Sequence, residues 1–279
     1  MTDSRQPAPD RVETGTLVID GVEVFFRRRA GEGPPAVFVH GNPTHSEDWL
    51  PFLRRLSGPA LAFDLPGWGR SGRPAGFDYS MRGLAAFFER AMEAFGVGRH
   101  ALVVHDWGSL ALIASQLAPE RLKRLVVINA VPLLPGYRWH RIARLWRTPG
   151  AGEAVNASLT RSAFSLGLRE SRADWGRPDD DFIEMIWRHL DRGTHRAVLE
   201  LYRSADPEEL AAAGAELDRL KCPALVVWGE EDRYLPTEFG RAYAERLPGA
   251  ELVIIPAAGH WPWHERPEVI DRVVAFLEP

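Results

Sequence analysis

Three residues, Asp106, Asp232 and His260, occur in an order and in local contexts that could support covalent catalysis. Asp106 ends an apolar run and is followed at once by Trp107-Gly108 and a helical pattern. Such a strand–turn–helix turn holds a nucleophile at its strained tip, and a glycine two residues on lets the helix pack close. An aspartate can also simply cap a helix, so Asp106 alone would not indicate chemistry.

The other two residues supply an acid and a base after later apolar runs. Asp232 ends the segment Trp228-Gly229-Glu230-Glu231-Asp232, and His260 lies in Ala258-Gly259-His260-Trp261. The chain order of nucleophile, acid and histidine is the order that a hydrolase with this turn requires. We expect Asp106 to attack, His260 to activate water, and Asp232 to hold the His260 tautomer.

A carboxylate nucleophile restricts the substrate. It is ionised at neutral pH, and its attack on an sp3 carbon gives an alkyl ester that water can cleave. A serine attacking the same carbon would give an ether, which is a dead end. An esterase or lactonase with Ser109 as its nucleophile is not expected, because Ser109 would lie inside the helix, past the tip of the turn.

The segment His40-Gly41-Asn42-Pro43 follows an earlier apolar run and predicts an oxyanion hole. We expect the backbone N–H groups of Asn42 and Trp107 to stabilise the tetrahedral intermediate formed when the ester is hydrolysed. The alternative is an ordinary loop shaped by glycine and proline.

Short apolar runs alternate with helical patterns and could position these residues. Alternation of this kind predicts a doubly wound α/β fold with a mostly parallel sheet. An opening hairpin is expected around Asp20-Gly21. The predicted strands are 16–19, 22–27, 36–40, 61–63, 102–105, 125–129, 224–228 and 252–255, and the predicted helices are 81–95, 107–117, 237–247 and 267–277.

The alternation stops between residues 131 and 219, where only helical patterns occur. We predict a helical cap over 131–219, inserted between a first core part at 1–130 and a second core part at 220–279. Helices are expected there over 140–147, 153–166, 179–191 and 194–204.

Composition excludes several classes of function. A net charge of -4 argues against nucleic-acid binding, which needs clustered positive charge. One cysteine allows no intrachain disulfide. No apolar run has the length of a signal peptide or a membrane span, so we expect a cytoplasmic protein without membrane contact. We expect no metal and no cofactor, and either a monomer or a homodimer.

The chain resembles the aspartate-nucleophile branch of the α/β-hydrolases, which includes epoxide hydrolases, haloalkane dehalogenases and fluoroacetate dehalogenases. The resemblance covers the core, about 22–130 and 224–277. It rests on three motifs: His40-Gly41-Asn42-Pro43, Asp64-Leu65-Pro66-Gly67-Trp68-Gly69-Arg70-Ser71 and His105-Asp106-Trp107-Gly108. It implies a small apolar substrate and water as the reactants.

The resemblance leaves two substrate classes open. The side chains of Asn42 and Trp107 match a pair that donates to halide in many haloalkane dehalogenases. Tyr202 lies in a segment similar to one that carries a ring-opening tyrosine of epoxide hydrolases, and we expect it to bind the epoxide oxygen near Asp106. Tyr137, the only other tyrosine of the expected cap, is expected to be the second ring-opening residue. We favour an epoxide hydrolase narrowly over a haloalkane dehalogenase. A binding protein on the same fold is disfavoured, because a pure binder need not keep Asp106, Asp232 and His260.

Overall fold

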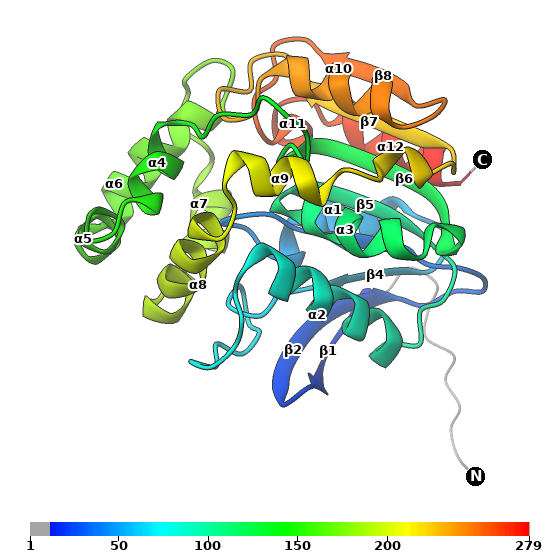
Figure 1. The fold of residues 1–279 in the computed structure, drawn as a ribbon, viewed down its shortest axis with the longest axis horizontal. Helices are drawn as coiled ribbons and strands as arrows, with labels where there is room; N and C mark the ends of the chain where they lie inside the picture. Colours follow the sequence, from blue (N-terminus) through cyan, green and yellow to red (C-terminus); the bar gives the residue numbers. More distant parts are fainter. Residues whose placement is uncertain (1–11, 279) are drawn as a thin grey trace.

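The computed structural model of the chain describes residues 12–278, and its centre is an eight-stranded sheet (Figure 1). The strands are β1 (Val12–Ile19), β2 (Val22–Arg29), β3 (Ala36–Val39), β4 (Ala60–Phe63), β5 (His100–Asp106), β6 (Leu122–Ala130), β7 (Ala224–Gly229) and β8 (Glu251–Ile255). Their order in the sheet is β1-β2-β4-β3-β5-β6-β7-β8. β1 pairs antiparallel with β2, as does β2 with β4, and the other neighbours pair parallel. The predicted mostly parallel α/β sheet is confirmed.

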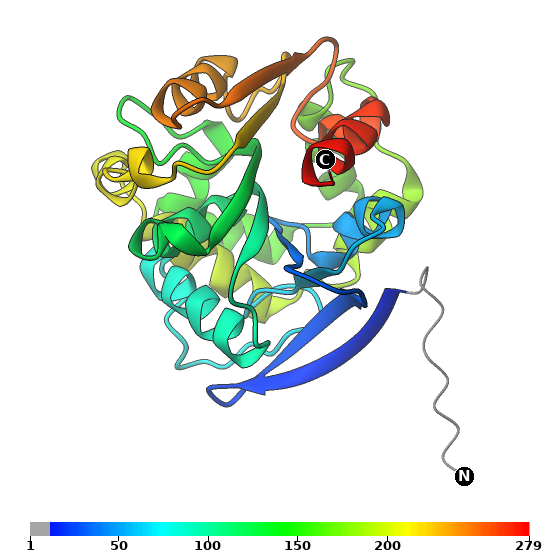
Figure 2. The same cartoon turned by 90° about the vertical axis from the view of Figure 1, so that its right-hand side faces the viewer.

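Both faces of the sheet are buried, which explains why the central strands are continuous apolar runs. Val37 and Val39 of β3 join one hydrophobic cluster, while Phe38 between them joins the other. Helices from either side supply the rest of each cluster, as Figure 2 shows with the sheet seen nearly edge-on. The first face carries α2 (Met81–Ala94), α3 (Leu110–Leu117) and α10 (Thr237–Arg246), and the second carries α1 (Leu50–Arg55) and α12 (Glu268–Leu277).

The opening hairpin turns at Asp20 and Gly21, as expected. Both residues have positive φ angles, 49° and 78°, which suits the two-residue turn that matches the twist of paired strands. The hairpin forms one edge of the sheet (Figure 2), and three strands separate β1 from β5, which ends at Asp106.

Between β6 and β7 the chain forms helices and no strand. These helices are α4 (Arg141–Arg147), α5 (Ala151–Ser158), α6 (Arg161–Gly167), α7 (Asp180–Trp187), α8 (Arg192–Arg203) and α9 (Pro207–Ala213). Helices α4 to α8 gather at one side of the sheet (Figure 1). In contrast, α9 packs on α3, where Gln116 Nε2 donates to the carbonyl of Ala213 at 2.8 Å. No helix among residues 12–278 combines the length and the apolar character needed to cross a membrane.

One predicted helix was wrong. The pattern over 153–166 forms two helices, α5 and α6, because Thr160 starts a new one. Its hydroxyl accepts from the Ala163 N–H at 3.2 Å, which is the bond of an N-cap residue.

Candidate active site

The turn after β5 presents Asp106 in a strained conformation. Its φ and ψ angles are 49° and -122°, a region that residues with a side chain rarely adopt. A short 3-10 helix, η2 (Trp107–Ser109), and then α3 follow at once. A Cβ atom at Gly108 would lie 2.2 Å from the Val39 carbonyl oxygen, so only glycine lets this turn pack against β3. The local fold is therefore the expected nucleophile turn.

The loop after β3 brings a backbone donor to the nucleophile. The Asn42 N–H donates to Oδ1 of Asp106 at 2.7 Å. A Cβ atom at Gly41 would lie 2.3 Å from Cβ of Asp106, so glycine is what permits this close approach. Asn42 thus stands where an oxyanion-hole donor is needed. No hydrogen bond from the Trp107 backbone N–H to Asp106 accompanies it, and the oxyanion hole of Asn42 and Trp107 stays a prediction.

His260 lies between the two carboxylates. Its Nδ1 is 2.8 Å from Oδ2 of Asp232, and its Nε2 is 3.6 Å from Oδ2 of Asp106. Since a carboxylate only accepts, Nδ1 carries the proton toward Asp232, and Nε2 is the atom that faces the nucleophile. The structure thus brings together the three residues singled out in the sequence.

Asp232 is held by three further donors. Its Oδ1 accepts from the backbone N–H groups of Tyr234 and Leu235 at 2.8 and 3.1 Å. Its Oδ2 accepts from Nδ2 of Asn129, at the end of the neighbouring strand β6, at 2.6 Å. The Asn129 amide is itself fixed, because its Oδ1 accepts from the Gly229 N–H at 3.0 Å.

The charges of the three residues support one another. Burial acts to lower the pKa of His260, but the negative charge of Asp232 and hydrogen bonds to Asp106 and Asp232 raise this pKa to about 10. Burial acts to raise the pKa of Asp106, but the hydrogen bond and charge of His260 hold it below its ordinary value. The resting site is therefore an imidazolium between two carboxylates.

Tyr202 of α8 lines the same cavity as Asp106. Its ring meets the Trp107 ring edge-to-face, with centroids 5.1 Å apart. Burial and then the negative charge of Asp106 raise the pKa of the Tyr202 phenol well above its ordinary value, while the nearby Trp107 and Asn42 side chains oppose this rise. Trp107 Nε1 lies near the phenol but makes no hydrogen bond of regular geometry, although it is buried.

A cavity of about 200 Å³ joins these groups to the helices beyond the sheet. Its inner end is lined by Asn42, Asp106, Tyr202 and His260. Most of the remaining lining is apolar, which suits a small apolar substrate. The apolar lining comprises Ile142, Trp146, Val155, Leu159, Ala163, Phe164, Leu168, Leu190 and Val198.

Two cavity residues, His140 and Tyr234, were missed in the sequence. Nδ1 of His140 accepts from the Ala143 N–H at 3.4 Å, and burial lowers the pKa of His140 to about 4. The ring is therefore neutral, with its N–H on Nε2. Tyr234 lies two residues after Asp232, and its ring meets that of His260 edge-to-face. The only available signal was this spacing, typical of a turn in which an aspartate accepts the N–H two residues on.

Tyr137 was expected beside the nucleophile as a second tyrosine, and the structure places it elsewhere. It is not among the residues that line the cavity, and its hydroxyl donates to the Tyr234 carbonyl at 3.4 Å. Its ring packs edge-to-face on Trp139 and Phe239. Tyr137 therefore fills the seam behind the cavity, where its large apolar area is buried.

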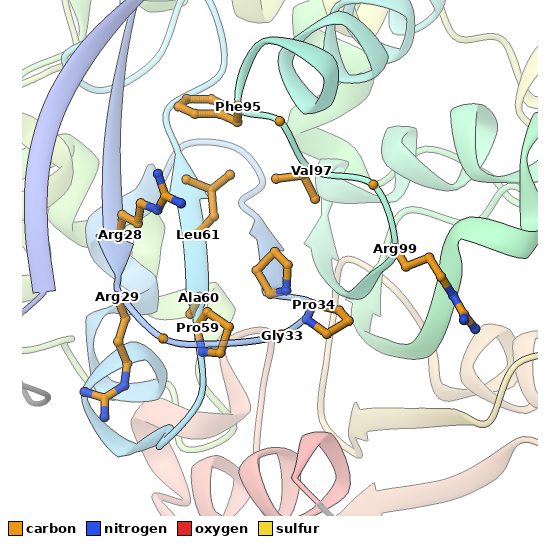
Figure 3. A pocket seen from close by; sticks show the side chains of 14 residues that line it. Arg28, Arg29, Gly33, Pro34, Pro59, Ala60, Leu61, Phe95, Val97 and Arg99 are labelled. Carbon is orange, nitrogen blue, oxygen red and sulfur yellow. The ribbon is translucent and has the colours of Figure 1, made fainter.

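A second cavity, of about 240 Å³, lies at the opposite ends of the parallel strands and carries no acid–base pair. Figure 3 shows the side chains of Arg29 and Arg99 pointing away from each other, so they do not form a cradle for an anion.

Among residues 12–278, no three histidine, cysteine, aspartate or glutamate side chains are grouped to hold a metal ion.

Comparison with known proteins agrees with the architecture. A haloalkane dehalogenase of Bradyrhizobium diazoefficiens is 28% identical, over 96% of this chain and 94% of that protein. A 2-hydroxy-6-oxononadienedioate/2-hydroxy-6-oxononatrienedioate hydrolase of Burkholderia vietnamiensis is 27% identical, over 92% of both. The crystal structure of a loop variant of haloalkane dehalogenase DbeA from Bradyrhizobium elkanii has a TM-score of 0.80 at 25% identity, covering 95% of both chains. The model of the alpha/beta hydrolase family matches residues 36–273, and the chain belongs to that family.

Proposed function

We propose that the protein hydrolyses a bond between an sp3 carbon and a leaving group through an alkyl ester of Asp106. One observation carries the proposal: Oδ1 of Asp106 is held by the Asn42 N–H, while Oδ2 faces Nε2 of His260. The proposed nucleophile is thus a carboxylate with one oxygen on a backbone N–H and the other beside the His260 ring.

The geometry assigns the two oxygens different tasks. Oδ2 attacks the carbon, and the electron pair of the breaking bond leaves with the halide or the epoxide oxygen. Oδ1 becomes the ester carbonyl oxygen. The His260 ring then releases its Nε2 proton to solvent, because the ester no longer carries the negative charge of Asp106. Nε2 next takes a proton from water, and the hydroxide adds to the Asp106 carboxyl carbon while the Asn42 N–H stabilises the charge on Oδ1. Collapse of the tetrahedral intermediate breaks the bond between the carboxyl carbon and Oδ2. The alcohol leaves with this oxygen and takes a proton from His260.

We propose halide as the leaving group. Asn42 lines the cavity together with Asp106, and Trp107, the residue after Asp106, has a buried indole N–H without a partner. Side-chain N–H groups of this kind stabilise a halide without needing to give up a proton. The similarity to haloalkane dehalogenases over nearly the whole chain supports the same choice. Together these observations outweigh the narrow preference for epoxides that the sequence suggested.

Epoxide opening is the second candidate, because its alkoxide needs an O–H or N–H that can transfer a proton. Tyr202 and His140 both line the cavity, and Tyr202 is close enough for Asp106 to affect its pKa. The unsaturated dicarboxylate named for one relative is not favoured as a substrate. No arginine or lysine lines the cavity, so two carboxylates would be buried without a partner.

The variant His260→Gln distinguishes these candidates, because the ester should form and persist. The purified variant is incubated with n-butyl bromide or styrene oxide, and intact mass and peptide mapping follow. An unsubstituted butyl group on Asp106 supports halide displacement, and a hydroxyalkyl group supports epoxide opening. The matched control is His260→Gln combined with Asp106→Asn, which should form neither adduct. An adduct on another residue, or none with either reagent, contradicts the proposal.

A further inference from the structure

The active-site cavity shares three lining residues with a second, outer cavity. Asn156 of α5, Leu190 before α8 and His195 of α8 line both cavities, and we call these three residues the neck. The outer cavity has a volume of about 770 Å³ and is otherwise lined mainly by charged and polar side chains. The neck thus separates an apolar chamber at Asp106 from a polar groove on the helices.

The orientation of the Asn156 amide is fixed. Trp146 Nε1 donates to Oδ1 of Asn156 at 3.2 Å, and an indole nitrogen can only donate. The Nδ2 group therefore occupies the other side of the amide. It is buried without a hydrogen-bond partner, in a residue only 7% exposed.

His195 brings a second unsatisfied atom to the neck. Its Nε2 is also buried without a partner. Burial lowers the pKa of His195, so the ring is neutral near pH 7 and can either donate or accept one hydrogen bond through Nε2. A buried polar atom without a partner is costly, so two of them on residues of the neck indicate a missing hydrogen-bonding group.

We propose that the neck is a binding subsite for an uncharged oxygen at the far end of the substrate. The inference rests on the proposed function: the substrate then carries its electrophilic carbon at one end and a hydroxyl, ether or carbonyl oxygen at the other. Asn156 Nδ2 donates to this oxygen, and a hydroxyl can donate in turn to His195 Nε2. The apolar chamber holds the chain between them.

The charges around the neck favour a neutral oxygen over an anion. The Arg203 guanidinium in the outer cavity is held by Glu153, with Nη1 2.7 Å from Oε1 and Nη2 2.8 Å from Oε2. Arg196 lies 3.9 Å from Glu200. Two of the three arginines that line the outer cavity are therefore paired with glutamates, and the donors at the neck itself are uncharged.

Ligand binding tests the subsite without relying on turnover. The side-chain amide signals of Asn156 are assigned by NMR through their loss in Asn156→Leu. We expect them to shift with α,ω-hexanediol, and the diol to bind about fivefold to tenfold more tightly than n-hexanol. Asn156→Leu should abolish this preference. Unchanged amide signals and equal affinities, as expected if a trapped water alone fills the neck, overturn the proposal.

Kinetics then connect the subsite to the reaction. The ratio of kcat/KM for ω-hydroxyhexyl bromide to that for n-hexyl bromide should fall about fivefold to tenfold in Asn156→Leu, and also in His195→Phe. The matched control is Leu159→Val, which changes the apolar lining and should leave the ratio unchanged. An equal loss on both bromides overturns the subsite. If neither bromide reacts in the wild-type protein, halide displacement fails, and the NMR result decides the subsite alone.

Discussion

Trp68 Nε1 donates to Oδ1 of Asn42 across 3.2 Å. Because the indole can only donate, this contact determines which end of the Asn42 amide faces it and turns Nδ2 to the other side. Trp68 belongs to the segment Asp64–Ser71, which the sequence marked as a family motif without assigning it a task. Its position is fixed by neighbouring turns, in which Gly67 and Gly69 have φ angles of 98° and 55°.

Trp68→Phe should therefore slow ester formation with an alkyl bromide by about tenfold, the effect of weakening one donor to a developing anion. Hydrolysis of the ester should change little, since the Asn42 backbone N–H remains on Oδ1 of Asp106. Rapid-quench measurement of the two steps separates these effects. Added to Asn42→Ala, Trp68→Phe should cause little further loss. Fully additive losses would show that Trp68 acts by another route.

Tyr202→Phe is expected to distinguish the two leaving groups. A halide keeps its Asn42 and Trp107 donors in this variant, so ester formation from a bromide should fall less than about fivefold. An epoxide loses a proton donor, and its opening should fall by about a hundredfold, which is typical of a lost general acid. Tyr137→Phe is the matched control, because its hydroxyl faces the Tyr234 carbonyl outside the cavity. A large loss with the bromide contradicts the proposed donor pair.

The sequence predicted the sheet and singled out the three residues that meet at the site, because each is specified locally. A buried strand, a tight turn and a helix follow one another at Asp106, and Asp232 and His260 each come just after a strand. Residues that reach the cavity through packing between different helices had no such local signal. His140 reaches the cavity only through the packing of α4, and Asn156 reaches the neck only because α5 lies against α8. The prediction for Tyr137 failed for the same reason, because the sequence does not show how the segment between β6 and β7 packs against the sheet.

Asn129 provides a test of how the acid is held. Its Nδ2 donates to the oxygen of Asp232 that also meets His260. Asn129→Asp places a second carboxylate there, and two adjacent carboxylates share one proton until a raised pKa is passed. Above that pKa the extra negative charge raises the pKa of His260. Single-turnover hydrolysis of the ester, which needs neutral His260, should then require a higher pH than in the wild-type protein.

The matched control for this change is Asn129→Ala, which removes the same donor without adding charge. It should lower the hydrolysis rate while shifting its pH dependence less than Asn129→Asp does. Equal pH profiles for the two variants would show that Asn129 acts through shape alone.

The charge state of His260 should change during the reaction. In the resting site, Asp106 and Asp232 together raise the pKa of His260 to about 10, so between pH 6.5 and this value the ring is protonated. Alkylation converts Asp106 to a neutral ester and removes one of the two supporting charges. The pKa of His260 must then fall, and a proton leaves the ring before water can be activated. Ester formation from a bromide should therefore release up to about one proton per site.

A pH-indicator dye in weakly buffered stopped flow can follow this proton, at a pH between 6.5 and about 10. With a bromide, release should coincide with ester formation and precede alcohol formation. With an epoxide, the alkoxide takes up a proton in the same step, so little or no net release is expected. His260→Gln is the decisive control, because its ester should form without any release. If wild-type protein alkylates Asp106 while the dye stays silent, then His260 is neutral in the resting site, and its proximity to Asp106 does not keep it charged.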